Sequence, residues 1–158
     1  SSAAKDAVRQ TQAVAALRWL ATFRDRPLLL AGDFNATTQV AASNDWEIER
    51  LEARVLFERI GALGLHDVIA RTKDSRPPLS ICSCGTPERC SHVRTFRGNN
   101  SADSRPTQLD YAFASAQLLP GMTCRIDDNE LAWSLSDHCP VVMDFQYPSE
   151  APGPHLRG

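Results

Sequence analysis

The stretch LLLAGDFNAT, Leu28 to Thr37, joins an apolar run to a glycine and two short polar side chains. A continuous apolar run predicts a short strand over 28–31 with both faces covered. Gly32 ends that strand and lets the backbone turn or a ligand approach closely. Asp33 and Asn35, two residues apart, then point the same way beyond the strand. Taken alone, the stretch also fits an Asx-type turn in which both side chains bond local backbone.

The remaining pattern predicts a mixed α/β chain. One amphipathic helix covers residues 6 to about 24, and its shared face carries Val8, Gln12, Ala15, Trp19 and Phe23. A second helix starts at Asn44 or Asp45, and its apolar stripe is Ile48, Leu51, Val55, Leu56 and Ile60. Strands are expected at about 92–97, at 108–114 with one buried face, within 121–133, and at 141–145.

Length and composition suit one domain. The 158 residues are 42% hydrophobic, and no apolar run approaches the length of a membrane span. We expect the domain to cover residues 1–147 and a flexible tail to cover 148–158. The net charge of -2 gives no global case for nucleic-acid binding, although residues 71–105 form a locally basic segment.

Two later stretches place acids and a histidine beside strands. TQLDYAFAS, residues 107–115, puts Asp110 on the side opposite Leu109 and Tyr111, and an acid in an apolar strand needs a partner or water. SLSDHCPVV, residues 134–142, puts Asp137 and His138 directly before an apolar strand. A carboxylate that holds one imidazole nitrogen sets the tautomer and raises the basicity of the ring. A capped strand end is the alternative for an isolated Asp-His pair.

Together, and in this order, the three stretches resemble the endonuclease/exonuclease/phosphatase family, which has the fold of pancreatic deoxyribonuclease. The matching segments are Gly32-Asp33-Phe34-Asn35, Leu109-Asp110-Tyr111 and Ser136-Asp137-His138 followed by Pro140. The resemblance extends over roughly residues 8–146. It implies a four-layer α/β sandwich that hydrolyses phosphodiesters or phosphomonoesters with Mg²⁺ or Mn²⁺, as a nuclease or a phosphatase.

The resemblance also implies roles for individual residues. Asp33 would orient or deprotonate the attacking water, and Asn35 would hydrogen-bond the phosphoryl group. His138 would donate to a phosphate oxygen, Asp110 would hold His138, and Asp137 would lie at or beside the metal. This agrees with the chemistry, because phosphoryl transfer depends mostly on positioning and charge stabilisation, and divalent metals prefer carboxylate oxygens.

The chain departs from the family by beginning at the helix before Gly-Asp-Phe-Asn. The family domain has two similar halves, and its first half supplies a metal-binding Glu. We therefore expect this chain to be the C-terminal half of such a domain, with a mostly antiparallel sheet and two main helices. Alone, the chain should be inactive or nearly so. The missing half would be a separate chain, a cleaved piece or a swapped second copy.

The segment CSCGTPERCSH supplies four metal-type side chains within a loop at 80–93. Cys82, Cys84, Cys90 and His92 could close a tetrahedral structural zinc site, although one-residue spacing within each pair is atypical. The alternatives are free thiols or a disulfide from Cys90 to Cys82 or Cys84. Clustered thiols of this kind weakly favour a reducing, cytoplasmic compartment. Cys124 and Cys139 are expected to be buried small hydrophobes.

Three arginines near the cysteine loop offer phosphate contacts, or simply a solvated surface: Arg89, Arg94 and Arg97. If these arginines are needed for binding while Asp33 and His138 are not, the chain is instead a non-catalytic zinc-knuckle module that binds nucleic acid. A degenerate scaffold domain is a third reading, disfavoured because the expected polar positions are intact. The sequence does not separate DNA, RNA, inositol phosphate or a lipid head group as substrate, nor endo- from exonucleolytic action.

Overall fold

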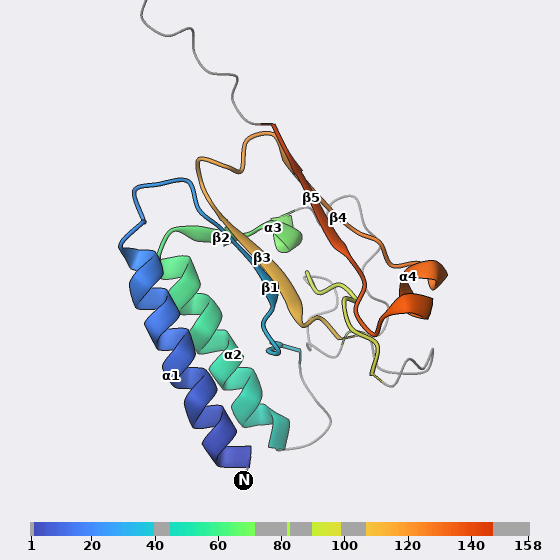
Figure 1. The fold of residues 1–158 in the computed structure, drawn as a ribbon, viewed down its shortest axis with the longest axis horizontal. Coiled ribbons are helices and arrows are strands. Elements are labelled where there is room, and N and C mark those ends of the chain that lie inside the picture. The colour runs from blue at the N-terminus through green and yellow to red at the C-terminus, as the bar shows by residue number, and fades with distance from the viewer. Residues whose placement is uncertain (1, 40–44, 72–81, 83–89, 99–106, 147–158) are drawn as a thin grey trace, which may run out of the picture.

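The chain folds into two antiparallel sheets with two long helices on one side (Figure 1). The computed structural model describes residues 2–39, 45–71, 82, 90–98 and 107–146. The elements are α1 (Ser2–Ala21), β1 (Leu29–Asp33), α2 (Asp45–Ala62), β2 (Leu65–Asp67), α3 (Val68–Arg71), β3 (Asp110–Ser115), β4 (Met122–Ile126), α4 (Glu130–Leu135) and β5 (Val141–Phe145). Most of the cysteine loop, the proposed cap Asn44 and the tail lie outside these residues. No helix of the described part is long and apolar enough to cross a membrane.

The two sheets and the helices form layers. One sheet has the order β1-β3-β2 and the other pairs β4 with β5, all antiparallel. Helices α1 and α2 lie side by side against the first sheet, and α3 contacts both β3 and β4 (Figure 1). The expected mixed α/β class with mainly antiparallel strands is therefore confirmed.

Strand β3 lies at the centre of the core and is buried on both faces. Tyr111 and Phe113 pack toward the helices, in a cluster that includes Ile60. Ala112 and Ala114 alternate with them and pack toward α3 and the second sheet. The expected single buried face was wrong, because small alanines let α3 and β4 cover the side opposite the aromatic residues.

The predicted buried face of α1 is also wrong. Val8 is 55% exposed and Trp19 is 64% exposed. Leu17 instead joins the cluster that contains Leu30. Apolar side chains are spread around this helix, so periodicity alone did not decide which face meets the sheet.

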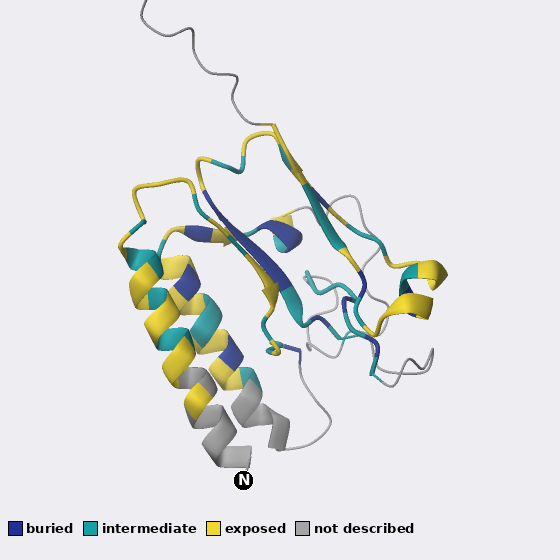
Figure 2. Ribbon diagram, in the orientation of Figure 1, coloured by how far each residue is buried: buried dark blue, intermediate teal, exposed yellow. Residues whose placement is uncertain are grey.

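Strand β1 is the expected strand, but it is not covered on both faces. It runs one residue past Gly32 to Asp33, and every residue except Leu30 is exposed (Figure 2). Leu30 pairs with Phe113 and faces the helices, whereas Leu29 and Ala31 share the opposite face. That face is exposed because the described part of the second sheet does not extend over it.

The strand expected at about 92–97 does not form as a regular strand. Within the described residues 90–98, Phe96 makes only isolated bridges to Thr107 and to His138. The region 121–133 contains β4, as expected, and also the unexpected helix α4. Asn129 caps α4 by accepting a hydrogen bond from the Ala132 N–H at 3.0 Å.

The turn between β2 and α3 gives a stability prediction at Asp67. Its carboxylate accepts a hydrogen bond from the Ala70 N–H at 2.9 Å. Burial raises the pKa of Asp67, an effect that backbone hydrogen bonds from Ala70 and Ile69 partly oppose. The folded state therefore holds the proton more tightly than the unfolded state, so this group costs stability as the pH rises through its unfolded and then its folded pKa.

We expect Asp67→Asn to be at least as stable as the wild type at pH 7, because the amide removes the buried charge and keeps an acceptor. Asp67→Ala loses the cap and should be destabilised by about 1 kcal/mol. Urea unfolding at pH 7 and pH 4 measures both, and the advantage of the amide should shrink at the lower pH. Equal destabilisation of the two variants at pH 7 would contradict the role given to burial.

Candidate active site

Two carboxylates face each other across β1 and β3. Asp33 is the last residue of β1 and pairs with Asp110, the first residue of β3. Side chains of directly opposed residues lie on the same face and close together, and like charges at such positions repel. This end of the sheet therefore needs a positive group to balance the two acids.

His138 supplies a partner for one of these acids. Its Nδ1 lies 2.8 Å from Oδ2 of Asp110, although the two residues are 28 positions apart. The His138 backbone N–H donates to Ser136 Oγ at 3.0 Å, and its ring lies 5.0 Å from the Phe96 ring, centroid to centroid. Asp110 thus fixes the Nδ1–H form of His138 and leaves Nε2 for another group.

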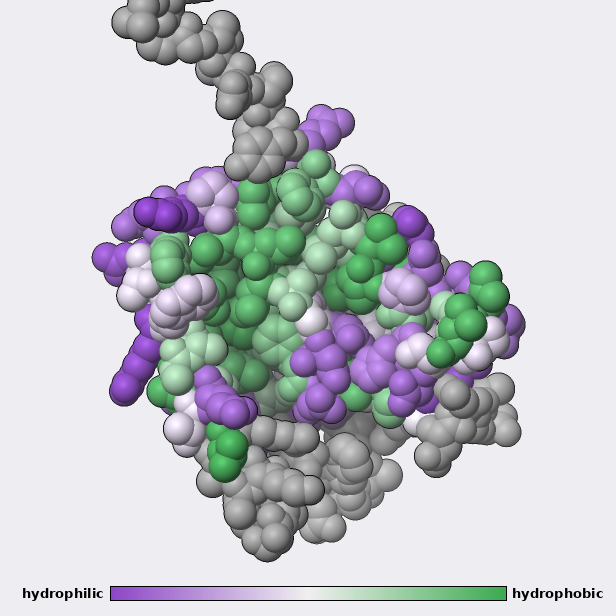
Figure 3. Space-filling view, in the orientation of Figure 1, coloured by the Kyte–Doolittle hydropathy of each residue, from purple (hydrophilic) through white to green (hydrophobic). Residues whose placement is uncertain are grey.

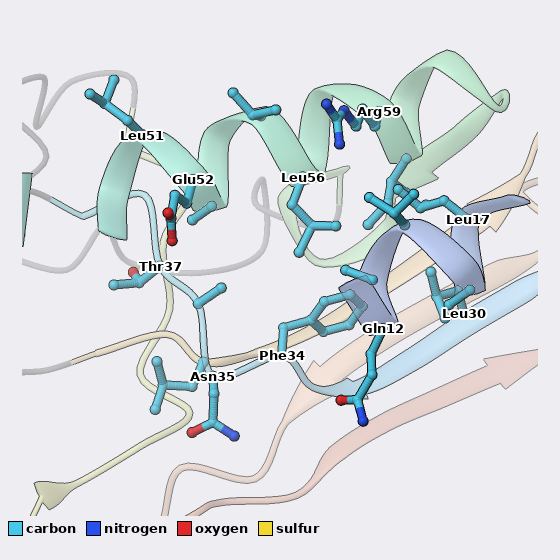
Figure 4. A pocket seen from close by; sticks show the side chains of 18 of the residues that line it. Gln12, Leu17, Leu30, Phe34, Asn35, Thr37, Leu51, Glu52, Leu56 and Arg59 are labelled. Atoms are coloured by element: carbon cyan, nitrogen blue, oxygen red, sulfur yellow. The ribbon is translucent and has the colours of Figure 1, made fainter. Parts of the chain in front are cut away.

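Asn35 closes a turn onto Asp33. Asn35 has a φ of 47°, a left-handed conformation that asparagine tolerates. Its backbone N–H donates to Asp33 Oδ1 and its Nδ2 donates to Asp33 Oδ2, both at 2.8 Å. The Asx turn is therefore present, and it also holds the amide beside the carboxylate. In Figure 4 the Asn35 side chain points away from α2.

A buried threonine supports the start of β3. Thr95 is fully buried, and its Oγ1 accepts hydrogen bonds from the N–H groups of Leu109 and Asp110, each at 3.0 Å. Thr95 and Phe96 are site residues that sequence reasoning missed. Their types carry no motif, and only the pairing of distant segments reveals them.

The other proposed site residues lie apart from this pair. Asp137 is exposed, and its backbone carbonyl accepts a hydrogen bond from the Arg97 N–H at 2.8 Å. The Arg97 guanidinium lies 4.6 Å from the centre of the Trp133 ring and 3.5 Å from Glu130. Arg97 is buried, so in this structure it belongs to the packing around α4, and Arg89 lies outside the described residues.

The arrangement offers donors to a divalent metal. Ligand atoms of Asp33, Asp110 and His138 all lie within 4.8 Å of one another, and the described residues place no Asp137 oxygen in this group. Carboxylate oxygens suit Mg²⁺ or Mn²⁺. Asp33 is the more exposed of the two acids, although Asn35 donates to both of its carboxylate oxygens. These residues fit part of a metal site and need further oxygen ligands to complete one.

The cysteine loop forms a second cluster. Cys82 Sγ and Cys90 Sγ each lie 3.5 Å from His92 Nδ1. Both cysteines are thiols in the structure, which contains neither of the alternative disulfides of Cys90. Burial lowers the pKa of His92, which favours the neutral ring. Cys84, the fourth expected ligand, lies outside the described residues.

The two remaining cysteines are buried, as expected. Cys124 belongs to the core around β3. Cys139 follows His138, and its Sγ donates to the Arg94 carbonyl at 3.2 Å. Burial, with a smaller contribution from nearby acids, raises the pKa of the Cys139 thiol to about 12. Cys139 is therefore protonated at neutral pH and is not a nucleophile for the adjacent site.

A cavity of about 690 Å³ opens between α1, α2 and the end of β1 (Figure 4). Most of its wall is apolar and includes Leu17, Leu30 and Leu56. Asn35 reaches its edge, but neither Asp110 nor His138 lines it. The cavity therefore lies behind the polar cluster rather than over it.

Comparisons with known proteins agree with this arrangement. The sequence model described as the endonuclease/exonuclease/phosphatase family matches residues 2–138. No curated protein matches the chain. Among solved structures, the chain is similar to the 3'-5' exonuclease NExo from Neisseria meningitidis, with a TM-score of 0.60 and 17% identity. A 3' phosphatase NExo variant from Neisseria bound to a product DNA hairpin gives a TM-score of 0.59 and 17% identity.

The matches cover most of this chain but only part of the similar structures. Each likeness covers 87% of this chain but 53% of the Neisseria chain, so this chain spans about half the length of those proteins. At this identity the structural likeness establishes the fold. The family match, in contrast, extends over most of the chain and includes the segments that hold Asp33, Asp110 and His138. The chain therefore belongs to the endonuclease/exonuclease/phosphatase family.

Proposed function

We propose that this chain carries half of the active site of a metal-dependent phosphoesterase that cleaves phosphodiesters or phosphomonoesters. The observation that carries the proposal is the hydrogen bond of 2.8 Å between His138 Nδ1 and Asp110, beside the facing carboxylate of Asp33. An acid, an amide and an acid-supported imidazole at one sheet end match the needs of phosphoryl transfer, which are positioning and charge stabilisation.

Asp33 and Asn35 act on the nucleophile side. Asp33 accepts a proton from the attacking water as the water oxygen bonds to phosphorus. Asn35 donates from its amide to a non-bridging phosphoryl oxygen, which a second carboxylate would repel. In the free site this amide is held on Asp33, so substrate binding must exchange one hydrogen bond for the other.

His138 acts on the developing negative charge. Asp110 stabilises the imidazolium form through Nδ1–H, and Nε2–H then donates to a phosphate oxygen while the bond from phosphorus to the leaving oxygen breaks. The leaving oxygen takes up a proton from water. Asp110 does not touch the substrate in this scheme, so it is a positioning residue.

Mg²⁺ or Mn²⁺, when bound, would neutralise phosphate charge. Asp33 is the residue of this chain that we assign to hold it, together with oxygen ligands from outside the described residues. Asp137, which lies apart from Asp33, would join it only after a movement of its side chain. A phosphate contact by Arg97 would require its guanidinium to leave the Trp133 ring. The buried Arg97 also weakens the alternative of a nucleic-acid module that binds through exposed arginines.

The first substrate to test is a DNA end. The similar Neisseria proteins are described as a 3'-5' exonuclease and as a 3' phosphatase bound to a product DNA hairpin. A 3'-phosphorylated DNA hairpin therefore offers both a phosphomonoester and neighbouring phosphodiesters. An inositol phosphate serves as the comparison substrate from a different class.

We also propose that the other half of the domain covers β1, supplied in the same polypeptide, by a second chain or by a swapped copy. Within the described residues β1 has a single strand neighbour, β3. Leu29 and Ala31 are exposed on one face of β1, and apolar side chains gather over the middle of the molecule (Figure 3). An exposed strand edge with an apolar face is suited to further pairing.

The decisive experiment compares this chain alone with the assembled domain. The assembled domain is this chain together with the first half from whichever of these sources supplies it, and it is called the full-length protein below. Hydrolysis of a 3'-phosphorylated DNA hairpin is measured with Mg²⁺, with Mn²⁺ and with EDTA. We expect the full-length protein to be active with either metal, and this chain alone to show little or no activity. Activity of the chain alone would overturn the proposed incompleteness. No hydrolysis of any phosphate ester by the full-length protein with either metal would overturn the proposed function.

A further inference from the structure

The second cluster has the spacing of a bound zinc ion. Zn²⁺ binds thiolate sulfur at about 2.3 Å and imidazole nitrogen at about 2.0 Å, so a tetrahedral site separates sulfur from nitrogen by about 3.5 Å. Cys82 Sγ and Cys90 Sγ each lie 3.5 Å from His92 Nδ1. All three ligand atoms lie within 4.8 Å of one another. The two sulfur–nitrogen distances therefore match those of a tetrahedral zinc site.

The surroundings of His92 present Nδ1 as the metal-binding nitrogen. His92 Nε2 lies 2.8 Å from Thr38 Oγ1, on the opposite side of the ring from the two sulfurs. If Nε2 carries the proton and donates it to Thr38, Nδ1 holds a free lone pair toward Cys82 and Cys90. Metal-binding histidines in proteins are oriented in this way, by a hydrogen bond from the other ring nitrogen.

A buried glutamine orients the sulfur of Cys82. Gln39 is buried, and its Oε1 accepts a hydrogen bond from the Gln108 N–H at 2.8 Å. That bond identifies the Gln39 oxygen, so the Gln39 Nε2–H group faces Cys82 Sγ, at 3.5 Å. An N–H donor to a cysteine sulfur is the kind of outer contact that orients a metal ligand.

From these contacts we propose that Cys82, Cys90 and His92 bind a Zn²⁺ ion, separate from the Asp33–Asp110–His138 site, and that this ion holds the strand ends of the active site in place. The site joins three segments through short links. Thr38 and Gln39 follow Asn35, and Gln108 precedes Asp110. The Gln108 Oε1 accepts the Val93 N–H at 3.1 Å, which ties the same segment to the histidine loop.

The proposed effect on the active site runs through Thr95. Thr95 lies three residues after His92 and accepts the N–H groups of Leu109 and Asp110. Loss of the ion would release the 90–97 segment and with it the support of Asp110. The proposal of zinc binding rests only on the contacts of Cys82, Cys90 and His92. Its effect on hydrolysis also rests on the proposed function.

The first test is the metal content of the protein purified from zinc-supplemented medium, measured by mass spectrometry. We expect one zinc per chain, a loss of most of it in Cys90→Ala, and no loss in the matched variant Cys124→Ala, which removes a buried thiol elsewhere. Cobalt exchanged into the wild-type protein should show the visible absorption of tetrahedral thiolate coordination, a readout that does not require any variant to fold.

A milder variant tests the assigned orientation of His92. Thr38→Val keeps the shape of the side chain and removes its acceptor, so zinc affinity should fall by about 10- to 100-fold. Thr123→Val, on the exposed side of β4, is the control and should leave the affinity unchanged. Affinity is measured by competition with a chromogenic chelator, in the presence of excess Mg²⁺.

Two results would overturn the zinc site. One is a metal-free protein from zinc-supplemented medium that takes up no cobalt, and the other is an intact mass two hydrogens lower, which indicates a disulfide. Full hydrolytic activity after zinc removal by a zinc-selective chelator in excess Mg²⁺ would overturn the link to Asp110 alone. Failure of hydrolysis in the zinc-loaded full-length protein would count against the proposed function and would leave the zinc site standing.

Discussion

Replacing His138 with alanine is expected to lower kcat for phosphate-ester hydrolysis by about 10²- to 10⁴-fold in the full-length protein, with a smaller change in KM. The imidazolium contact to phosphate strengthens as charge develops, so its removal affects the transition state more than the bound substrate. The change also leaves the partly buried Asp110 carboxylate without its partner at 2.8 Å. Rates at saturating substrate, measured with the 3'-phosphorylated hairpin, give the loss directly.

His66→Ala is the matched control. His66 is exposed on β2 and pairs across to Ala114, away from the polar cluster. Its removal should leave kcat within about twofold, the size of effect expected for a surface position. Equal losses in the two variants would show that His138 contributes only to the fold.

The positioning role of Asp110 adds a second check on the same pair. Asp110→Asn should lower kcat with a smaller change in KM, because the amide no longer fixes the Nδ1–H form of His138. In a double-mutant cycle the two losses should be strongly non-additive, since each variant disables the same hydrogen-bonded unit.

The local parts of the site could be predicted from sequence because each rests on a short pattern. The apolar run before Gly32 predicts a strand, which the structure contains as β1. Asp33 is the last residue of β1, and Asp110 is the first residue of β3. The contact between Asp110 and His138 could not be predicted from such a short pattern. Nothing in either stretch encodes a contact across 28 positions, so that expectation came from the family resemblance and not from spacing.

Burial was harder to predict than the elements themselves. Leu29 is 40% exposed although it lies in an apolar run, because coverage depends on which other layers are present. Trp19 is exposed because α1 has apolar residues on more than one side and cannot bury all of them against the sheet. Helix α4 is short and begins at a cap, Asn129, and its one buried side chain is Trp133, so it has too few turns to show a helical period.

Replacing Asp33 with asparagine is expected to lower kcat by about 10²- to 10⁴-fold, the usual contribution of a general base. The amide nearly matches the carboxylate in shape and can still accept the Asn35 N–H, now at 2.8 Å from Oδ1. It cannot take a proton from water, and it is a weaker ligand for Mg²⁺. The fold should therefore survive while the chemistry fails.

The dependence of the rate on metal concentration separates the proton-accepting role from the metal role of Asp33. If the carboxylate mainly binds metal, raising Mg²⁺ or Mn²⁺ should restore much of the rate of Asp33→Asn; if it accepts the proton, the rate stays low at every metal concentration. Asp144→Asn, which removes an exposed carboxylate on β5, is the matched control for charge. A full rate in Asp33→Asn at the wild-type metal optimum would leave the Asx turn as the only function of Asp33. The catalytic assignment would then have to move to a carboxylate outside β1.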